Sequence, residues 1–194
     1  MKIKILEKTP GCMPEIIKKG DWIDLRLSED VHLAAPYVKT VTKQTEVDGK
    51  TVNQKVKKII FNSVIADLGI CVQVPKGYES IVVPRSSTFK NYGVMQTNSV
   101  GVIDQTYSSI KDVWRMPMIA FREKEVVIPK GTRIAQFRIQ LSQKATIWQK
   151  LKWLFTSSIK VEKVSTLSNE VRGGFGSTGQ IEFKTKENVK ENSK

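Results

Sequence analysis

The chain has 194 residues, 40% of them hydrophobic, which is enough to bury one core as a single domain. Charged residues interrupt every apolar run, which excludes a transmembrane helix, and the first twelve residues lack the apolar centre of a signal peptide. The net charge of +13 is compatible with nucleic-acid binding.

The distribution of this charge argues against nucleic acid. Residues 38–60 hold six Lys and two acids, and residues 140–165 hold five Lys and one acid, so each segment has a net charge of +4. Neither segment has the clustered arginine and interleaved aromatic side chains of a single-strand binder. We therefore expect a protein that does not bind nucleic acid, and the missing signal peptide and unpatterned cysteines make a cytoplasmic location the expectation.

Short segments rich in β-branched residues recur along the chain, and each shows the alternation of a half-buried strand. Turn signals at 75–77, 91–93 and 129–131 separate several of them. Many short strands with regular turns predict an all-β barrel or jelly-roll-like domain. The predicted strands cover residues 2–7, 22–27, 59–66, 69–74, 80–84, 100–103, 113–121 and 133–141.

Two segments look like additions to this β domain. The sequence VDGK at 47–50 is a two-residue hairpin signal, so residues 38–60 are predicted to form an extra β-arm. From Lys144 to Ser157 the apolar residues follow a helical period, with Trp153 on the opposite, basic face. We expect this helix to pack on the barrel through its apolar stripe; contact with a membrane or a partner is the alternative. The stripe consists of Ile147, Leu151, Leu154 and Phe155, with Trp148 at its edge.

The two cysteines match no metal or redox spacing. Cys71 lies in an apolar run and is interpreted as a small buried hydrophobe, as suits a reducing compartment. The last residues, 180–194, are polar and are predicted to be a disordered basic tail.

The most informative stretch is 84–107, which contains two polar runs. Arg85, Ser86 and Ser87 suit an anionic ligand, because a guanidinium and hydroxyl groups can share phosphate oxygens. The run GVIDQTY places Asp104 at the end of an apolar strand, three residues before Tyr107, where a carboxylate can serve as a base.

Three further runs accompany this stretch in a fixed order. They are GDWIDL at 20–25, GTRIAQ at 131–136 and the glycine-rich RGGFGSTG at 172–179. Glycines let backbone N–H groups approach phosphate oxygens closely.

In this order the five runs resemble the motifs of the trimeric dUTP nucleotidohydrolases (dUTPases), in a branch found in Gram-positive bacteria and their phages. The resemblance covers residues 2–179, apart from insertions at about 38–60 and 142–160. It implies a single jelly-roll-like β-barrel domain over residues 1–179 and a homotrimer whose active sites take residues from all three subunits. A C-terminal arm, residues 165–179, reaches across to a neighbour.

The resemblance also implies roles for individual residues. Asp104 would be the general base that activates a water for in-line attack on the α-phosphate of dUTP. Mg²⁺ would bridge the phosphates, with Asp24 touching the hydrated ion through water. The phosphate-binding residues would be Arg85, Ser86, Ser87 and Gln136 from one subunit and Arg172, Ser177 and Thr178 from another.

Uracil specificity would come from a hairpin at 98–104, where Asn98 and the backbone from Gly101 to Ile103 pair with the base edge. Tyr107 would lie against the deoxyribose and exclude a 2′-hydroxyl. Phe175, beside Gly176 in the arm, would stack on uracil, and Trp114 is the alternative ring. On this interpretation Arg85 and Asp104 serve different sites of the trimer.

Two other functions remain open from the sequence. A dCTP deaminase shares the fold and an Arg-Ser-Ser motif, but it needs an acid on the strand at 112–119, where only Asp112 at the start could serve. A regulatory protein on a dUTPase scaffold would use residues 38–60 or 144–157 to bind a partner.

Overall fold

In the computed structural model, the described residues are 1–16, 20–47, 49–156, 158–171 and 174, and these form fourteen strands and two short helices. The first half of the chain contains β1 (Lys2–Glu7), β2 (Ile23–Arg26), β3 (Val31–Leu33), β4 (Tyr37–Val47), β5 (Lys50–Ile60), β6 (Ser63–Asp67), β7 (Ile70–Gln73) and β8 (Tyr78–Pro84). The second half contains α1 (Ser86–Tyr92), β9 (Val94–Gln96), β10 (Gly101–Asp104), β11 (Arg115–Ala120), β12 (Val126–Ile128), β13 (Arg133–Leu141), α2 (Ile147–Leu154) and β14 (Lys160–Lys163).

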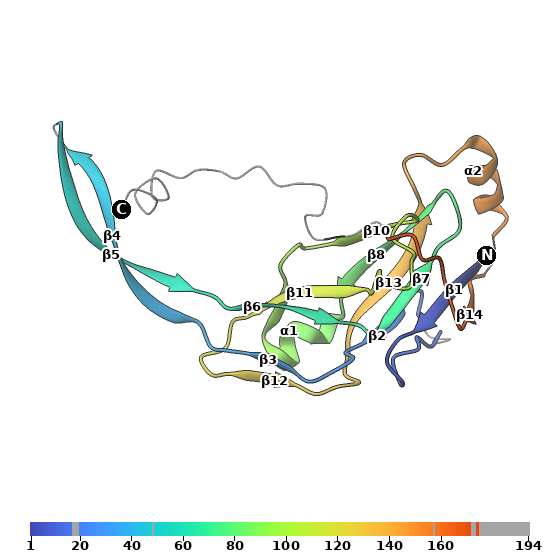
Figure 1. Cartoon of the computed structure of the whole chain (residues 1–194), viewed down its shortest axis with the longest axis horizontal. Coiled ribbons are helices and arrows are strands. Elements are labelled where there is room, and N and C mark those ends of the chain that lie inside the picture. The colour runs from blue at the N-terminus through green and yellow to red at the C-terminus, as the bar shows by residue number, and fades with distance from the viewer. Residues whose placement is uncertain (17–19, 48, 157, 172–173, 175–194) are drawn as a thin grey trace.

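The strands form small sheets whose inner faces share one core (Figure 1). The largest sheet has the order β10-β8-β13-β2, and β8 and β13 pair along seven residues. Two three-stranded sheets, β14-β1-β7 and β6-β11-β9, and the pair β12-β3 complete the body. This mostly β architecture, a jelly-roll-like arrangement of packed sheets, confirms the predicted fold class.

The core contains side chains from all of these sheets. Ile3, Ile5 and Leu25 are fully buried, as the alternating pattern of their strands predicts. At the centre the ring of Trp114 meets that of Phe137 edge-on, with centroids 5.1 Å apart. Burial of so many strand residues explains why the sequence pattern located most strands of the body correctly.

Helix α1 and four of the short strands were not predicted. The helix has only seven residues, too few for a helical period to stand out, and the strands β3, β9, β12 and β14 have three or four. Thr88 is buried and its hydroxyl donates to the carbonyl of Ile134 at 2.7 Å, which fixes α1 on β13. Gly93 ends the helix with a φ of 65°, a left-handed conformation that glycine adopts without strain.

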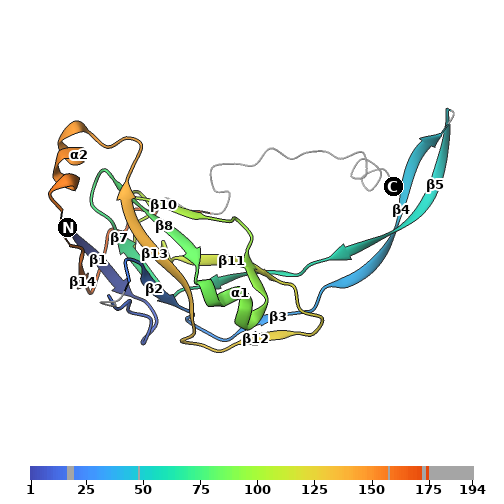
Figure 2. The same ribbon diagram turned by 180° about the vertical axis from the view of Figure 1, so that it is seen from behind.

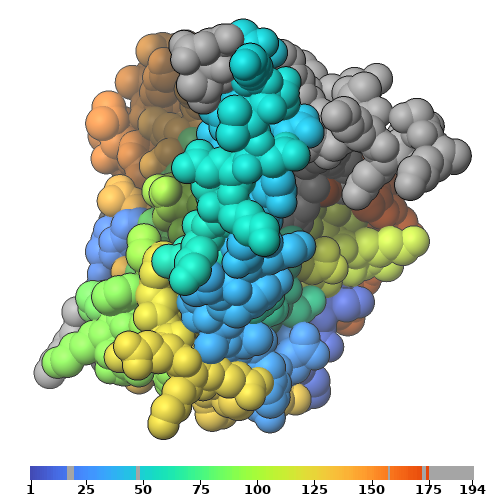
Figure 3. Space-filling model, turned by 90° about the vertical axis from the view of Figure 1, so that its left-hand side faces the viewer, coloured from blue at the N-terminus to red at the C-terminus, as the bar shows by residue number. Residues whose placement is uncertain are grey.

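The predicted arm is confirmed. Strands β4 and β5 pair in register from Tyr37–Ile60 to Val47–Lys50 and form a two-stranded sheet of their own. The arm projects from the body at the end opposite α2 (Figure 2), and Figure 3 views the molecule from the arm's end. Gly49, in the turn, has a φ of 72°.

The predicted helix is present but shorter, and its orientation is opposite to the one expected. Trp153 and Gln149 are partly buried, and the ring of Trp153 packs on that of Tyr78 with centroids 5.6 Å apart. The indole of Trp153 buries apolar area against the body through this contact. The predicted stripe is instead exposed to solvent: Ile147 65%, Trp148 77%, Leu151 40%, Leu154 75% and Phe155 85%. Ser157 lies outside the described residues.

Neither helix of the described chain is long and apolar enough to cross a bilayer. Cys12 and Cys71 are free and buried, which for Cys71 confirms the prediction, and burial raises the pKa of the Cys71 thiol to about 11.

Candidate functional site

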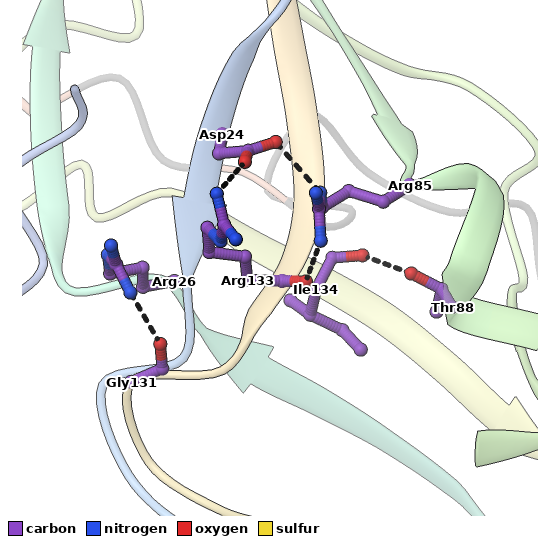
Figure 4. A network of polar contacts seen from close by, with 7 residues as sticks. All are labelled: Asp24, Arg26, Arg85, Thr88, Gly131, Arg133 and Ile134. Carbon is purple, nitrogen blue, oxygen red and sulfur yellow. Dashed lines mark hydrogen bonds and ion pairs between the residues drawn. The ribbon is translucent and has the colours of Figure 1, made fainter. Parts of the chain in front are cut away.

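Arg85 lies at the junction of β8 and α1, where its side chain turns toward β2 and β13 (Figure 4). Its Nε forms an ion pair with Oδ1 of Asp24 at 2.9 Å, and a second nitrogen donates to the carbonyl of Arg133 at 3.4 Å. Nη1 of Arg133 meets the other oxygen of Asp24 at 3.1 Å. Two guanidinium groups therefore converge on one carboxylate that is 8% exposed.

This arrangement gives Asp24 a clear structural effect. Both of its oxygens are paired with arginines, so the carboxylate fixes the direction of the Arg85 side chain, which is itself 28% exposed. Gln136 pairs in register with Asp24 on one side and with Val83 on the other, next to the strand end that leads to Arg85. Ser86 is exposed and Ser87 partly exposed in the first turn of α1.

The sequence-predicted phosphate residues Arg85, Ser86, Ser87 and Gln136 are thus gathered by the β8–α1 junction and β13. Arg133 was not predicted as a site residue, although it lies in the GTRIAQ run. Its side chain is 43% exposed and adds a second positive charge beside Arg85. An anion at this junction would contact two guanidinium groups, which form planar, bidentate contacts better than lysine ammonium groups do.

A hollow of about 350 Å³ opens beside Arg85 and reaches the turn after β9. Phe89, Met95, Gln96 and Ser99 line it together with Arg85. This volume lies within the range of small-molecule sites.

The segment 98–104 is a turn between two sheets and not the hairpin that was predicted. Strand β9 pairs with β11, whereas β10 pairs with β8, so the chain crosses from one sheet to the other. Ser99 takes a left-handed φ of 57°, which reverses the chain there. Asn98 is exposed, and its side-chain oxygen accepts from Gln96 at 2.7 Å. Gly101 and Ile103 lie on β10, opposite Val82 and Ser80.

Asp104 is the last residue of β10, opposite Glu79 at the start of β8. Its Oδ1 accepts from the backbone N–H of Thr106 at 2.8 Å and from the Thr106 hydroxyl at 2.6 Å. The N–H of Tyr107 donates to the carbonyl of Asp104 at 3.1 Å and closes a turn over residues 104–107. The turn holds one face of the carboxylate and leaves the group partly exposed.

Tyr107 also stabilises this turn. Its hydroxyl donates to the carbonyl of Val113 at 3.0 Å, and burial, followed by the charge of Asp112, raises the pKa of the phenol. The neutral ring is therefore a packing surface. A methyl group built at Gly174, the one described residue of the RGGFGSTG run, would lie 3.1 Å from the ring, so Gly174 lies against Tyr107.

Comparison with known proteins identifies the family of this chain. A dUTPase family profile matches residues 49–179. The chain is 39% identical over 179 residues to the SPbeta prophage-derived deoxyuridine 5′-triphosphate nucleotidohydrolase YosS of Bacillus subtilis, covering 92% of this chain and 97% of that protein. This chain belongs to the dUTPase family.

Solved structures similar to this dUTPase show the same fold. A Staphylococcus bacteriophage 80alpha dUTPase variant with dUpNHpp aligns with a TM-score of 0.54 and 16% identity, over 92% of this chain and 98% of that chain. A dUTPase variant from phage phi11 of S. aureus, described with a structural Mg(II) ion, aligns with a TM-score of 0.52 and 15% identity, over 75% of this chain and 94% of that chain.

Five predicted site residues of the dUTPase lie outside the described residues. They are Arg172, Phe175, Gly176, Ser177 and Thr178, all in the glycine-rich run. The alternative stacking ring, Trp114, is fully buried against Phe137, so the prediction that it reaches uracil is wrong. An indole at the centre of the core cannot also face a ligand.

The structure gives no support to a deaminase. Asp112 is 1% exposed, and its Oδ2 accepts from the N–H of Ser109 at 3.0 Å, in a turn before β11. A carboxylate buried in this way cannot serve a substrate. The strand that follows, RMPMIA, has no acid.

Among the described residues, no three His, Cys, Asp or Glu side chains gather as a metal site. The exposed donors beside Arg85 are cationic or neutral, and both oxygens of Asp24 are already paired. These side chains suit phosphate oxygens. A hard cation would therefore be held at this site by the triphosphate and by water, while the protein binds the phosphates.

Proposed function

We propose that this dUTPase hydrolyses dUTP to dUMP and pyrophosphate, and that Asp104 is the base that activates the attacking water. The observation that carries the proposal is the Asp104–Tyr107 turn. Thr106 donates two hydrogen bonds to one oxygen of Asp104, which fixes the direction of the carboxylate. A fixed, partly exposed carboxylate can take a proton from water as it attacks the α-phosphorus in line.

Arg85, Arg133, Gln136 and the hydroxyls of Ser86 and Ser87 would bind phosphate oxygens. Their charge would offset the negative charge that develops on the triphosphate. Arg172, Ser177 and Thr178 would hold the terminal phosphate from the C-terminal arm.

Mg²⁺ fits this site as a companion of the substrate. When bound, the ion neutralises phosphate charge and orients the triphosphate for in-line attack. The phi11 dUTPase, which has the same fold, is described with a structural Mg(II) ion. Asp24 would reach the hydrated ion only through water, because arginines occupy both of its oxygens.

Selectivity for uracil would depend on the turn after β9, where Asn98 and the backbone from Gly101 to Ile103 would face the base edge. Tyr107 would exclude a 2′-hydroxyl, and Phe175, beside Gly176, would stack on the base when the arm closes. In a homotrimer each site would combine Asp104 of one subunit with Arg85 of a neighbour.

Pyrophosphate release from dUTP, dCTP, dTTP and UTP, measured side by side with Mg²⁺, tests the proposal. We expect an appreciable rate of pyrophosphate release from dUTP and not from the other three nucleotides. Equal turnover of UTP would contradict the role of Tyr107, and ammonia release from dCTP would favour a deaminase. Tight dUTP binding without turnover would favour a regulatory protein on the dUTPase scaffold.

A further inference from the structure

Helix α2, part of the insertion at 142–160, is connected to the Asp104 turn through the loop between β7 and β8. The side chain of Gln149 donates to the carbonyl of Lys76 at 2.9 Å. The next residue, Gly77, donates its N–H to the side-chain oxygen of Gln105 at 2.7 Å. Gln105 directly follows Asp104, so two hydrogen bonds and one peptide unit separate the helix from the catalytic turn.

Gly77 is enclosed between these two glutamines. Its φ of 88° is left-handed, and a methyl group built on it would lie 2.3 Å from the amide of Gln149. Its carbonyl accepts from the N–H of Ser142, at the start of the segment that leads to α2. The loop therefore has little room to move unless α2 moves with it.

The Asp104 turn needs outside support, because its strand lies at the edge of a sheet. In the described residues β10 pairs only with β8, and its ladder ends at Asp104. Beyond that point the hydrogen bonds that hold the turn include those within it, that of the Tyr107 hydroxyl and the Gln105–Gly77 bond. The Gln105–Gly77 bond connects the turn to the loop that leads into β8.

The inner face of α2 is built for this contact. The side chain of Gln149 accepts from the N–H of Thr146 in a capping box and also donates to Lys76. Trp153 packs on the ring of Tyr78, the first residue of β8. The exposed apolar stripe takes no part, so Gln149 and Trp153 anchor the helix to the body.

We propose that Gln149 and Gln105 are positioning residues that, through Gly77, hold Asp104 in its productive direction. The inference rests on the proposed role of Asp104 as the base. Catalytic groups need placement within about 0.5 Å, and a misplacement of about 1 Å can cost two orders of magnitude in rate. The insertion thus stabilises the geometry of the active site.

A double-mutant cycle tests the proposal in the full chain. Gln149→Glu keeps the oxygen that accepts from Thr146 but loses the donor to Lys76; Gln105→Ala removes the acceptor of the Gly77 N–H. We expect each substitution to lower kcat for dUTP about three- to tenfold with little change in KM. The double variant should have the same kcat as the less active of the two single variants. Trp148→Ser, on the outer face of α2, is the matched control and should keep wild-type kcat.

Amide hydrogen exchange at residues 104–107 gives a second readout. Exchange there should become faster in Gln149→Glu and stay unchanged in Trp148→Ser. Independent, multiplicative losses in kcat, or wild-type kcat and exchange in Gln149→Glu, would overturn the proposal. If Gln149→Glu does not fold, Gly77→Ala, which pushes against the Gln149 amide, should give the same loss in kcat, and wild-type kcat there would overturn it.

Failure of the proposed function would look different. In that case the unaltered protein would not release pyrophosphate from dUTP, or Asp104→Asn would not reduce the release. The positioning proposal fails while the function stands when the unaltered enzyme is active, Asp104→Asn is inactive and both glutamine variants are normal.

Discussion

Arg85 and Asp104 lie at opposite ends of strand β8. Asp104 is paired with Glu79 at the start of the strand, and Arg85 follows its last residue, Pro84. Six residues of extended chain span about 20 Å. A base and a phosphate-binding cation that act on the same phosphoryl group must be much closer, so the proposed roles assign the Arg85 and Asp104 of one chain to different sites.

Complementation between impaired subunits tests this separation. At a dUTP concentration far below the KM of the Arg85→Ala protein, the Arg85→Ala and Asp104→Asn proteins should each turn over dUTP slowly alone and gain activity when they are unfolded together and refolded as mixed trimers. If each site takes one residue from each of two subunits, about a quarter of the sites in a one-to-one mixture would have both residues intact. The measurement is dUTP turnover after refolding, with each variant refolded alone as the control. Absence of any recovery, despite mixed trimers, would contradict the shared site.

Asp104→Asn should lower kcat for dUTP by at least about 10³-fold and leave nucleotide affinity nearly unchanged. The amide keeps the size of the side chain and can still accept from Thr106, but it cannot take a proton. Single-turnover kinetics and calorimetric titration with dUTP measure the two effects separately. Substantial residual turnover would refute Asp104 as the base.

Asp24→Asn should raise KM for dUTP less than Arg85→Ala does. Loss of Arg85 removes a charged hydrogen bond to phosphate, which corresponds to about a tenfold to hundredfold rise in KM. Loss of the Asp24 charge frees both guanidinium groups from their ion pairs but leaves them present. Steady-state kinetics at fixed Mg²⁺ measure both. A larger effect from Asp24→Asn would show that its contact with the hydrated ion dominates.

Glu7 should make the attachment of β14 sensitive to acid. Its side chain pairs with Lys163 of β14 and accepts from the N–H groups of Gly11 and Met13 at 2.8 and 3.0 Å. The Lys163 hydrogen bond chiefly holds the pKa of Glu7 below its ordinary value of 4.5. A lowered pKa in the folded state gives stability that is present above pH 4.5 and is lost as the pH falls through the folded pKa.

Glu7→Gln should therefore reduce the free energy of unfolding by about 1–3 kcal/mol at neutral pH, and by less at pH 3 to 4. Urea unfolding at a series of pH values measures the difference, with Lys2→Gln as a control, because its partner Glu162 is more exposed. A loss that is the same at all pH values would mean that the charge of Glu7 is not responsible.

Replacing residues 39–58 by a short turn should leave the melting temperature within a few degrees of wild type. The arm pairs only with itself in the described chain, and the Tyr37–Ile60 pair at its base remains. Differential scanning calorimetry and sizing of the assembly check this. Loss of the oligomer would show that the arm joins subunits instead.

Much of the fold could be predicted because local patterns carried it. Alternation located β1 and β13 to the residue, and the Asp-Gly signal predicted the arm, since strand period and turn chemistry are local properties. The same local signals failed for α1, which is fixed on β13 by the Thr88 hydrogen bond and the Gly93 cap.

The orientation of α2 shows what a local pattern cannot decide. Its stripe predicts an apolar inner face, yet Trp153 and Gln149 face the body, because Tyr78 and the Lys76 carbonyl lie there. Similarly, Trp114 beside the third run could be assigned to a ligand from sequence, whereas packing against Phe137 places it in the core.

The sequence by itself contains the five runs, and these were enough to determine the family and the residue types proposed for the active site. Only the tertiary structure decided that Asp24 fixes the direction of Arg85, that Arg133 joins them, and that Arg85 and Asp104 lie at opposite ends of β8. The reason is physical: residue chemistry is a property of each position, but distance and direction depend on which strands pair and in what register.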